Sequence, residues 1–165
     1  MVRSCDIVFA PTYVKIFLGK SKTDVYRDHH WIYLSASDSK CCPVKNLRIY
    51  MHQAGIVAET SEEFLIRAIT NFSKQNVQKL RVKNTPLSYT TARETFLAAV
   101  VKLGLRKEDF GLHSLRSGGA TAAANAGVPD RLFKRHGRWK SETVKDGYVQ
   151  DDISSLLVVS QCLGL

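Results

Sequence analysis

A run of small residues in the last third of the chain is the feature that most restricts how this sequence can fold. Residues 117–127 read SGGATAAANAG, and the segment 113–126 has the composition of a helix. Small side chains let a second element approach a helix closely, whereas the Gly118–Gly119 pair weakens the helix unless packing requires it. Gly127 is a suitable stop signal. We therefore expect a helix over 113–126 with another element packed closely against it.

Upstream of this run, two segments carry helix start and stop signals. The first is predicted to begin near Pro43, because proline suits the first helical turn, and to end at Gly55. The second is predicted to be capped by Thr90 or Thr91, with a glutamate at capping-box spacing, and to end at Gly104.

Downstream of the run, two shorter helices are predicted. Pro129 opens the segment 130–137 (DRLFKRHG), and Ser141 can cap a short helix that leads to Tyr148.

Strand signals are concentrated near the N-terminus. Residues 13–18 (YVKIFL) alternate apolar and polar side chains, and residues 31–34 (WIYL) form a second strand-like run. The polar, basic segment 19–28 lies between them, which predicts a β-hairpin with a basic loop. Residues 64–66 could form a further short strand, and the basic stretch 79–83 is expected to be a solvated loop.

The predicted fold class is therefore mainly α with a small antiparallel β-hairpin or three-stranded sheet (α+β). A length of 165 residues fits one domain, and 44% apolar residues suffice for a core. We expect one domain over 1–165, with the hairpin in 6–34, a helical body in 43–149 and an apolar tail in 150–165. No stretch approaches the ~18 apolar residues of a membrane span, and no signal peptide is recognised.

The charge balance suggests the class of partner. The chain has 24 Lys and Arg residues and 15 acidic residues, so the net charge is +9 and the isoelectric point is near 9.5. Such a basic domain favours nucleic acid as a partner, although an ordinary basic protein remains the alternative.

Cys41–Cys42 does not have zinc-ligand spacing, so free thiols in a reducing compartment are expected.

Four residues in the last third form an ordered set. His113-Ser114-Leu115-Arg116 has His-x-x-Arg spacing, Trp139 follows His136-Gly137-Arg138, and Tyr148 lies nine residues after Trp139. The order and gaps resemble the catalytic motif of the tyrosine recombinases (phage-integrase family), and the small-residue run resembles that family's small-residue helix. Each piece is weak alone, but the joint pattern is specific. The resemblance extends over about residues 6–149.

The chemistry of the set is coherent with this resemblance. A tyrosine hydroxyl can attack a DNA phosphate and hold the broken end covalently, which makes Tyr148 the expected nucleophile. Arg116 offers a planar fork of donors to two phosphate oxygens, and His113 can donate a hydrogen bond or move a proton. Trp139 offers an indole N–H that cannot be titrated. The resemblance also implies a leaving-group lysine in the hairpin, which best matches Lys22.

Several further residues are candidates for contacts with double-stranded DNA. Lys20 is the alternative to Lys22, and His136 can pack beside the phosphate or bond to backbone. The complete set of these candidates is Lys20, Arg27, Arg135, His136 and Arg138. No metal or nucleotide cofactor is implied, because transesterification conserves the bond energy.

Each member of the set also has an ordinary structural interpretation. Tyr148 and Trp139 could be aromatic residues of the core or its edge, His113 could cap a helix, and Arg116 could form a surface ion pair. Lys22 could be an ordinary hairpin charge.

The resemblance is incomplete at the N-terminus. The family uses two arginines, and Arg3 falls too late in the pattern to be the first. We therefore expect a catalytic domain shortened at its front, with weak or no activity, and the layout of residues 6–44 resembles recombinases of eukaryotic mobile elements. Such an origin would place the protein in the nucleus.

Three alternatives remain open. The chain could be a DNA-binding remnant without chemistry, a type IB topoisomerase-like enzyme, or a helical enzyme that does not act on nucleic acid. The tail 153–163 could dock on a second copy, giving a homo-oligomer on DNA, or pack in cis.

Overall fold

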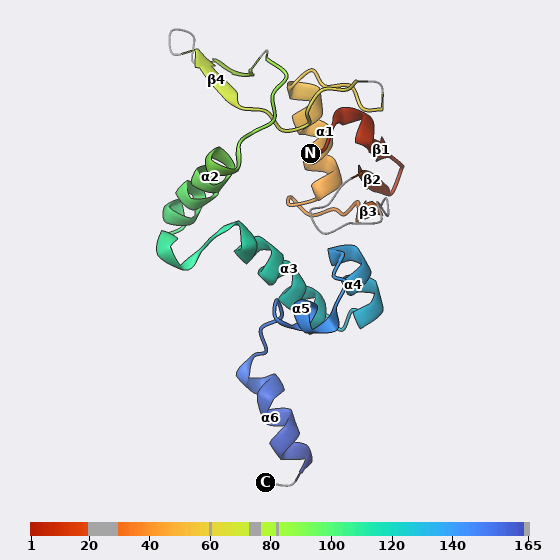
Figure 1. Cartoon of the computed structure of the whole chain (residues 1–165), viewed down its shortest axis with the longest axis vertical. Coiled ribbons are helices and arrows are strands. Elements are labelled where there is room, and N and C mark those ends of the chain that lie inside the picture. Colours follow the sequence, from red (N-terminus) through yellow and green to blue (C-terminus); the bar gives the residue numbers. More distant parts are fainter. Residues whose placement is uncertain (20–29, 60, 73–76, 82, 164–165) are drawn as a thin grey trace. The chain divides into compact units, whose positions relative to one another are not determined.

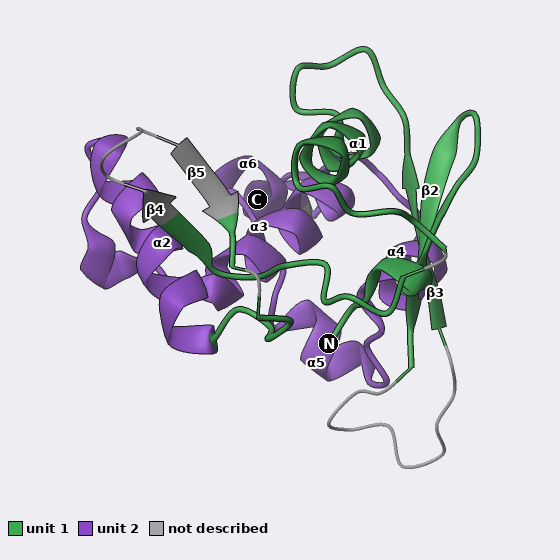
Figure 2. Ribbon diagram, turned by 90° about the horizontal axis from the view of Figure 1, so that it is seen from above, with its two compact units in different colours: residues 1–88 green, residues 89–165 purple. Residues whose placement is uncertain are grey.

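The computed structural model describes residues 1–19, 30–59, 61–72, 77–81 and 83–163 (Figure 1). About 48% of the chain is helical, and a small three-stranded antiparallel sheet accompanies the helices, which confirms the predicted α+β class. The chain divides into two compact units, residues 1–88 and residues 89–165, and each is described by itself (Figure 2). The single domain stays a prediction.

Unit 1 is built on the sheet. Its elements are a 3₁₀ turn η1 (Ser4–Asp6), β1 (Ile7–Phe9), β2 (Tyr13–Leu18), β3 (His30–Ser35), α1 (Pro43–Gln53), β4 (Ile69–Phe72) and β5 (Val77–Leu80). The strand order is β1-β2-β3, all antiparallel, with Ile7 opposite Ile16 and Phe17 opposite Trp31. The predicted hairpin is thus present, with a third strand added at its edge.

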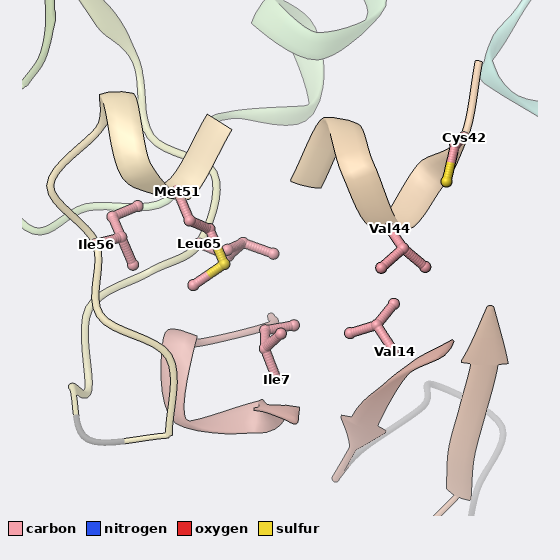
Figure 3. Packing of buried hydrophobic residues seen from close by; sticks show 7 residues of the cluster. All are labelled: Ile7, Val14, Cys42, Val44, Met51, Ile56 and Leu65. Atoms are coloured by element: carbon pink, nitrogen blue, oxygen red, sulfur yellow. The ribbon is translucent and has the colours of Figure 1, made fainter. Parts of the chain in front are cut away.

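The core of unit 1 lies between one face of this sheet and α1. Val14 of β2 points toward Val44 of α1, and Ile7 lies beside them (Figure 3). Alternation along the strands puts every second side chain on this face, which explains the apolar–polar pattern of 13–18. The α1 helix ends at the predicted place, because Gly55 adopts a left-handed φ of 66° that closes the last turn. The cluster consists of Ile7, Val14, Cys42, Val44, Met51, Ile56 and Leu65.

Two strand expectations were wrong in detail. Residues 64–66 do not form a strand; Phe64 makes only an isolated bridge to Arg3. The basic stretch 79–83 is not wholly a loop, because Lys79 belongs to β5, which pairs with β4. Arg81 and Lys83 lie beyond the end of β5 and are exposed, as expected of solvated residues.

Unit 2 is helical among its described residues. It comprises α2 (Tyr89–Lys102), a 3₁₀ turn η2 (Lys107–Asp109), α3 (Leu112–Asn125), α4 (Asp130–Gly137), α5 (Glu142–Asp146) and α6 (Ile153–Cys162). The α4 bounds match the prediction, and Ser141 caps α5 by accepting a bond from the Val144 amide at 3.5 Å. The α2 helix begins at Tyr89, so Thr90 and Thr91 lie inside its first turn rather than capping it.

The small-residue helix α3 packs differently from expectation. Gly118 and Gly119 are exposed, and an added Cβ at either would meet no described atom within 4 Å. Its packed face instead carries Ala120, with Phe133 and Trp139 against it. The close approach of Phe133 and Trp139 to α3 therefore depends on Ala120, one position after the glycine pair.

Candidate functional site

Arg116 lies at the centre of a cluster formed by α3 and the segments after it. Its guanidinium carbon lies 4.4 Å from the ring centre of Trp139 and 5.3 Å from that of Tyr148. One terminal nitrogen donates a hydrogen bond to the Gly137 carbonyl, at the end of α4. A guanidinium has five N–H donors in a fixed plane, so this bond orients the group and leaves donors for an anion.

Trp139 forms the wall of the cluster and is 9% exposed. Its ring meets Phe133 edge-on at 6.0 Å between centroids and Tyr148 at 5.7 Å. Its Nε1–H is buried and has no hydrogen-bond partner within the described part of the chain. A buried donor without a partner costs free energy, and such groups mark places where a ligand atom can complete the bond.

The turn before Trp139 explains how this ring reaches the cluster. Arg138 adopts a left-handed conformation (φ 56°, ψ 39°), which ends α4 and reverses the chain. Gly137 leaves room for the indole, because a Cβ built there would lie 1.8 Å from Trp139 Cζ3. The left-handed residue that usually follows a helix is glycine. In this turn, the glycine is needed one position earlier, where the ring crosses the backbone.

Tyr148 is half-buried, and its main chain is held by α3. The Tyr148 carbonyl accepts hydrogen bonds from Ser117 Oγ at 2.8 Å and Thr121 Oγ1 at 3.5 Å. Thr121 Oγ1 also accepts a bond from the Gln150 amide at 3.0 Å. Ser117 and Thr121 lie one helical turn apart on α3, so they fix the backbone around Tyr148 without using its hydroxyl.

A buried lysine joins α4 to α5 beside this cluster. Lys145 is 2% exposed, and its ammonium pairs with Asp130, with Glu142 at 3.0 Å and with Asp146 at 3.2 Å. The ammonium also lies 4.9 Å from the Phe133 ring centre. The bond to Asp130, then those to the other two carboxylates, raise the pKa of Lys145 against the opposing effect of burial. Its carbonyl accepts the amide of Tyr148 at 2.9 Å, so the lysine lies directly at the base of the tyrosine turn.

The structure brings together three of the predicted residues. Arg116, Trp139 and Tyr148 converge, whereas His113 is exposed in the first turn of α3 and no described contact links its side chain to them. Lys22, with Lys20 and Arg27, lies outside the described residues.

The remaining predicted DNA contacts lie at the end of α4. Arg135 and His136 are exposed in its last turn, and Arg138 is half-buried just after it.

The sequence did not identify several supporting residues. Lys145 carries no motif, and its main partner Asp130 is fifteen positions away. The Ser117–Thr121 pair had an available signal, since two hydroxyls four residues apart share one helix face. Gly137 could only be understood once the path of Trp139 was known.

The cysteines take structural or exposed positions in the described chain. Cys42 is buried at the N-terminus of α1, where its sulfur accepts the amides of Lys45 and Ser37. These bonds lower the pKa of the Cys42 thiol. Cys5, Cys41 and Cys162 are exposed free thiols, and the described residues contain no His, Cys, Asp or Glu group that could hold a metal ion. None of the described helices is both long and apolar enough to cross a membrane.

A mainly helical α+β chain with a convergent arginine, tryptophan and tyrosine has the features that the resemblance to tyrosine recombinases implies. No protein-family profile matches the chain. A curated protein of Selenomonas ruminantium described as an integrase/recombinase xerD homolog is 32% identical over 146 residues, which is 88% of this chain. The chain spans about 40% of that protein's length. The comparison supports the relation to the tyrosine recombinases at the level of the family.

Proposed function

We propose that this chain breaks and rejoins DNA strands, in site-specific recombination or integration, through a covalent 3′-phosphotyrosine at Tyr148. The observation that carries the proposal is the convergence of the Arg116 guanidinium and the unpartnered Trp139 N–H next to Tyr148. The similarity to an integrase/recombinase and the net charge of +9 point in the same direction.

The proposed step is a transesterification. The Tyr148 oxygen forms a bond to phosphorus, the bond from phosphorus to the 5′ oxygen breaks, the tyrosine loses its proton and the leaving oxygen gains one. Arg116 and Trp139 donate to the phosphate oxygens as negative charge grows in the transition state. His113 assists by donating a bond or moving a proton. Rejoining is the reverse reaction, in which a 5′ hydroxyl attacks the phosphotyrosine.

The remaining predicted residues have supporting roles in this proposal. Lys22, or Lys20 in its place, gives the proton to the leaving 5′ oxygen. Arg27, Arg135, His136 and Arg138 contact the DNA. Only one of the two arginine positions of the family motif has a match among these residues.

The test is covalent trapping on a nicked suicide DNA substrate. Wild type should give a denaturation-resistant adduct, and Tyr148→Phe should give none. The matched control is Tyr89→Phe, because Tyr89 is an exposed tyrosine at the start of α2 and should trap as wild type does. An adduct that survives Tyr148→Phe would refute the proposed nucleophile.

Two further outcomes separate the alternatives. DNA binding with no adduct favours a non-catalytic DNA-binding protein. Relaxation of supercoils without site preference favours topoisomerase-like activity. The eukaryotic mobile-element origin stays a prediction, while the relative found is bacterial.

We also propose that α6 docks on a second copy when the protein is on DNA. The α6 helix exposes several apolar side chains, among them Ile153 at 74% and Leu156 at 61%. Ending the chain after Asp152 should leave DNA binding and remove higher-order complexes in a mobility-shift assay. Unchanged complexes would instead indicate packing within one chain.

A further inference from the structure

The three-stranded sheet of unit 1 has one face that its core does not use. Val14 and its neighbours on β2 face α1 (Figure 3), so the alternate residues of β2 and β3 point the other way. The register places Lys15 opposite Tyr33 and Phe17 opposite Trp31 on this second face. We call it the aromatic face. It consists of Val8, Tyr13, Lys15, Phe17, Trp31, Tyr33 and Ser35.

Large rings on this face are exposed to solvent. Trp31 is 39% and Tyr33 54% exposed. The rings form two cross-strand pairs, Tyr13 with Tyr33 at 5.8 Å and Phe17 with Trp31 at 5.2 Å between centroids. Contiguous exposed aromatic surface is uncommon on a soluble protein and usually marks a binding surface.

The charge of the face indicates what it can bind. The Lys15 ammonium lies over the Trp31 ring, 4.6 Å from the ring centre. No carboxylate occurs among the seven residues of the face, and the whole chain carries +9. Rings in series around a cation suit unpaired bases on a phosphate backbone, because every base has a face that can stack and the phosphates attract the ammonium. A duplex does not offer its base faces in this way.

We propose that the aromatic face is a stacking platform for single-stranded DNA, with Trp31 and Tyr33 under successive bases and Lys15 turning from the Trp31 ring to the phosphate between them. It shares no residue with the Arg116, Trp139 and Tyr148 cluster, and it does not depend on any covalent step.

The test measures binding of a short fluorescein-labelled oligothymidylate to the full chain by anisotropy. Trp31→Leu should weaken binding about tenfold, within the range for loss of one base stack. Trp31→Phe should restore most of the affinity, because a ring remains. Lys15→Gln should weaken binding and reduce its salt dependence. Tyr89→Ala removes an exposed tyrosine outside the sheet and should bind as wild type does.

Folding of each variant is checked by circular dichroism. Trp31→Phe and Trp31→Leu both leave a large apolar side chain at this position, and only Trp31→Phe keeps an aromatic ring. Equal affinity of these two folded variants overturns the proposal. Tighter binding of oligouridylate overturns the assignment to DNA. Binding of a proline-rich peptide in place of oligothymidylate, or self-association that Trp31→Leu removes, overturns the assignment to nucleic acid. Because anisotropy reads binding alone, absence of the Tyr148 adduct leaves this proposal standing.

Discussion

At the scale of single residues, the buried N–H of Trp139 is the most informative group in unit 2. The ring meets Phe133 edge-on and has the Arg116 guanidinium over its face, yet its nitrogen has no partner in the described chain. An unpaired buried donor lowers the stability of the folded protein. A ligand oxygen that accepts its hydrogen bond removes this loss when the ligand binds. The packing and the donor function of Trp139 are therefore separable by substitution.

We expect Trp139→Phe to keep the fold and slow adduct formation by ~10²-fold, because a ring remains and one donor to the phosphate is lost. Trp139→His should recover part of the rate, since an imidazole restores an N–H. Single-turnover trapping measures the rates, and thermal unfolding checks the fold. A Trp139→Phe protein that traps DNA at the wild-type rate would show that Trp139 serves packing alone.

At the scale of elements, two glycines placed near the cluster should respond oppositely to the same change. Gly118 is exposed on α3 and an added Cβ meets no described atom within 4 Å, so Gly118→Ala should stabilise the protein by about 0.5–1 kcal/mol. At Gly137 the Cβ would overlap the Trp139 ring, so Gly137→Ala should destabilise it by about 1–3 kcal/mol and slow trapping. Denaturant unfolding measures both. Equal effects of the two substitutions would contradict the ring-over-glycine geometry.

The Lys145 clamp between α4 and α5 makes a prediction about pH. Lys134, then Lys145, lower the pKa of Glu142 below its usual 4.5, so its contribution to stability is present above pH 4.5 and is lost as the pH falls through the lower, folded value. The raised pKa of Lys145 contributes fully below 10.5 and is lost only as the pH rises beyond that. The contribution of this clamp to the melting temperature should therefore be level between these limits and fall outside them.

Lys145→Met tests the clamp. The variant should melt at a lower temperature at neutral pH, because three carboxylates lose their shared cation, and it should lose less stability on acidification than wild type. Lys102→Met, which removes an exposed lysine at the end of α2, is the matched control and should keep the wild-type acid profile. Identical acid profiles for the Lys145 variant and wild type would show that the Lys145 ion pairs do not determine the loss of stability on acidification.

At the scale of the whole molecule, local signals predicted local structure and little beyond it. The α4 helix and β2 were placed within their bounds because proline, glycine and alternation act on neighbouring residues. The Lys145 clamp joins α4 and α5 through charge, and β4 and β5 pair through their backbones; composition reveals neither contact. The convergence of Arg116, Trp139 and Tyr148 was predictable only through the resemblance. The orientation of Trp139 over Gly137 depends on tertiary packing, which no local sequence signal marks.

Net charge is a property of the whole chain, and it makes the last prediction. A chain of +9 that contacts about four phosphates should lose duplex affinity with a log–log salt slope of about −4 or steeper. Arg135→Gln should reduce the slope by about one, because Arg135 is exposed on α4 and is a proposed phosphate contact. Arg106→Gln should leave the slope unchanged, since Arg106 already makes two bonds of 2.9 Å to Asp109.

Oligothymidylate should keep a salt-resistant part of its affinity that Trp31→Leu removes, because stacking releases no counterions. A flat duplex slope would contradict phosphate recognition altogether, and a salt-resistant part that survives Trp31→Leu would place the stacking elsewhere on the protein.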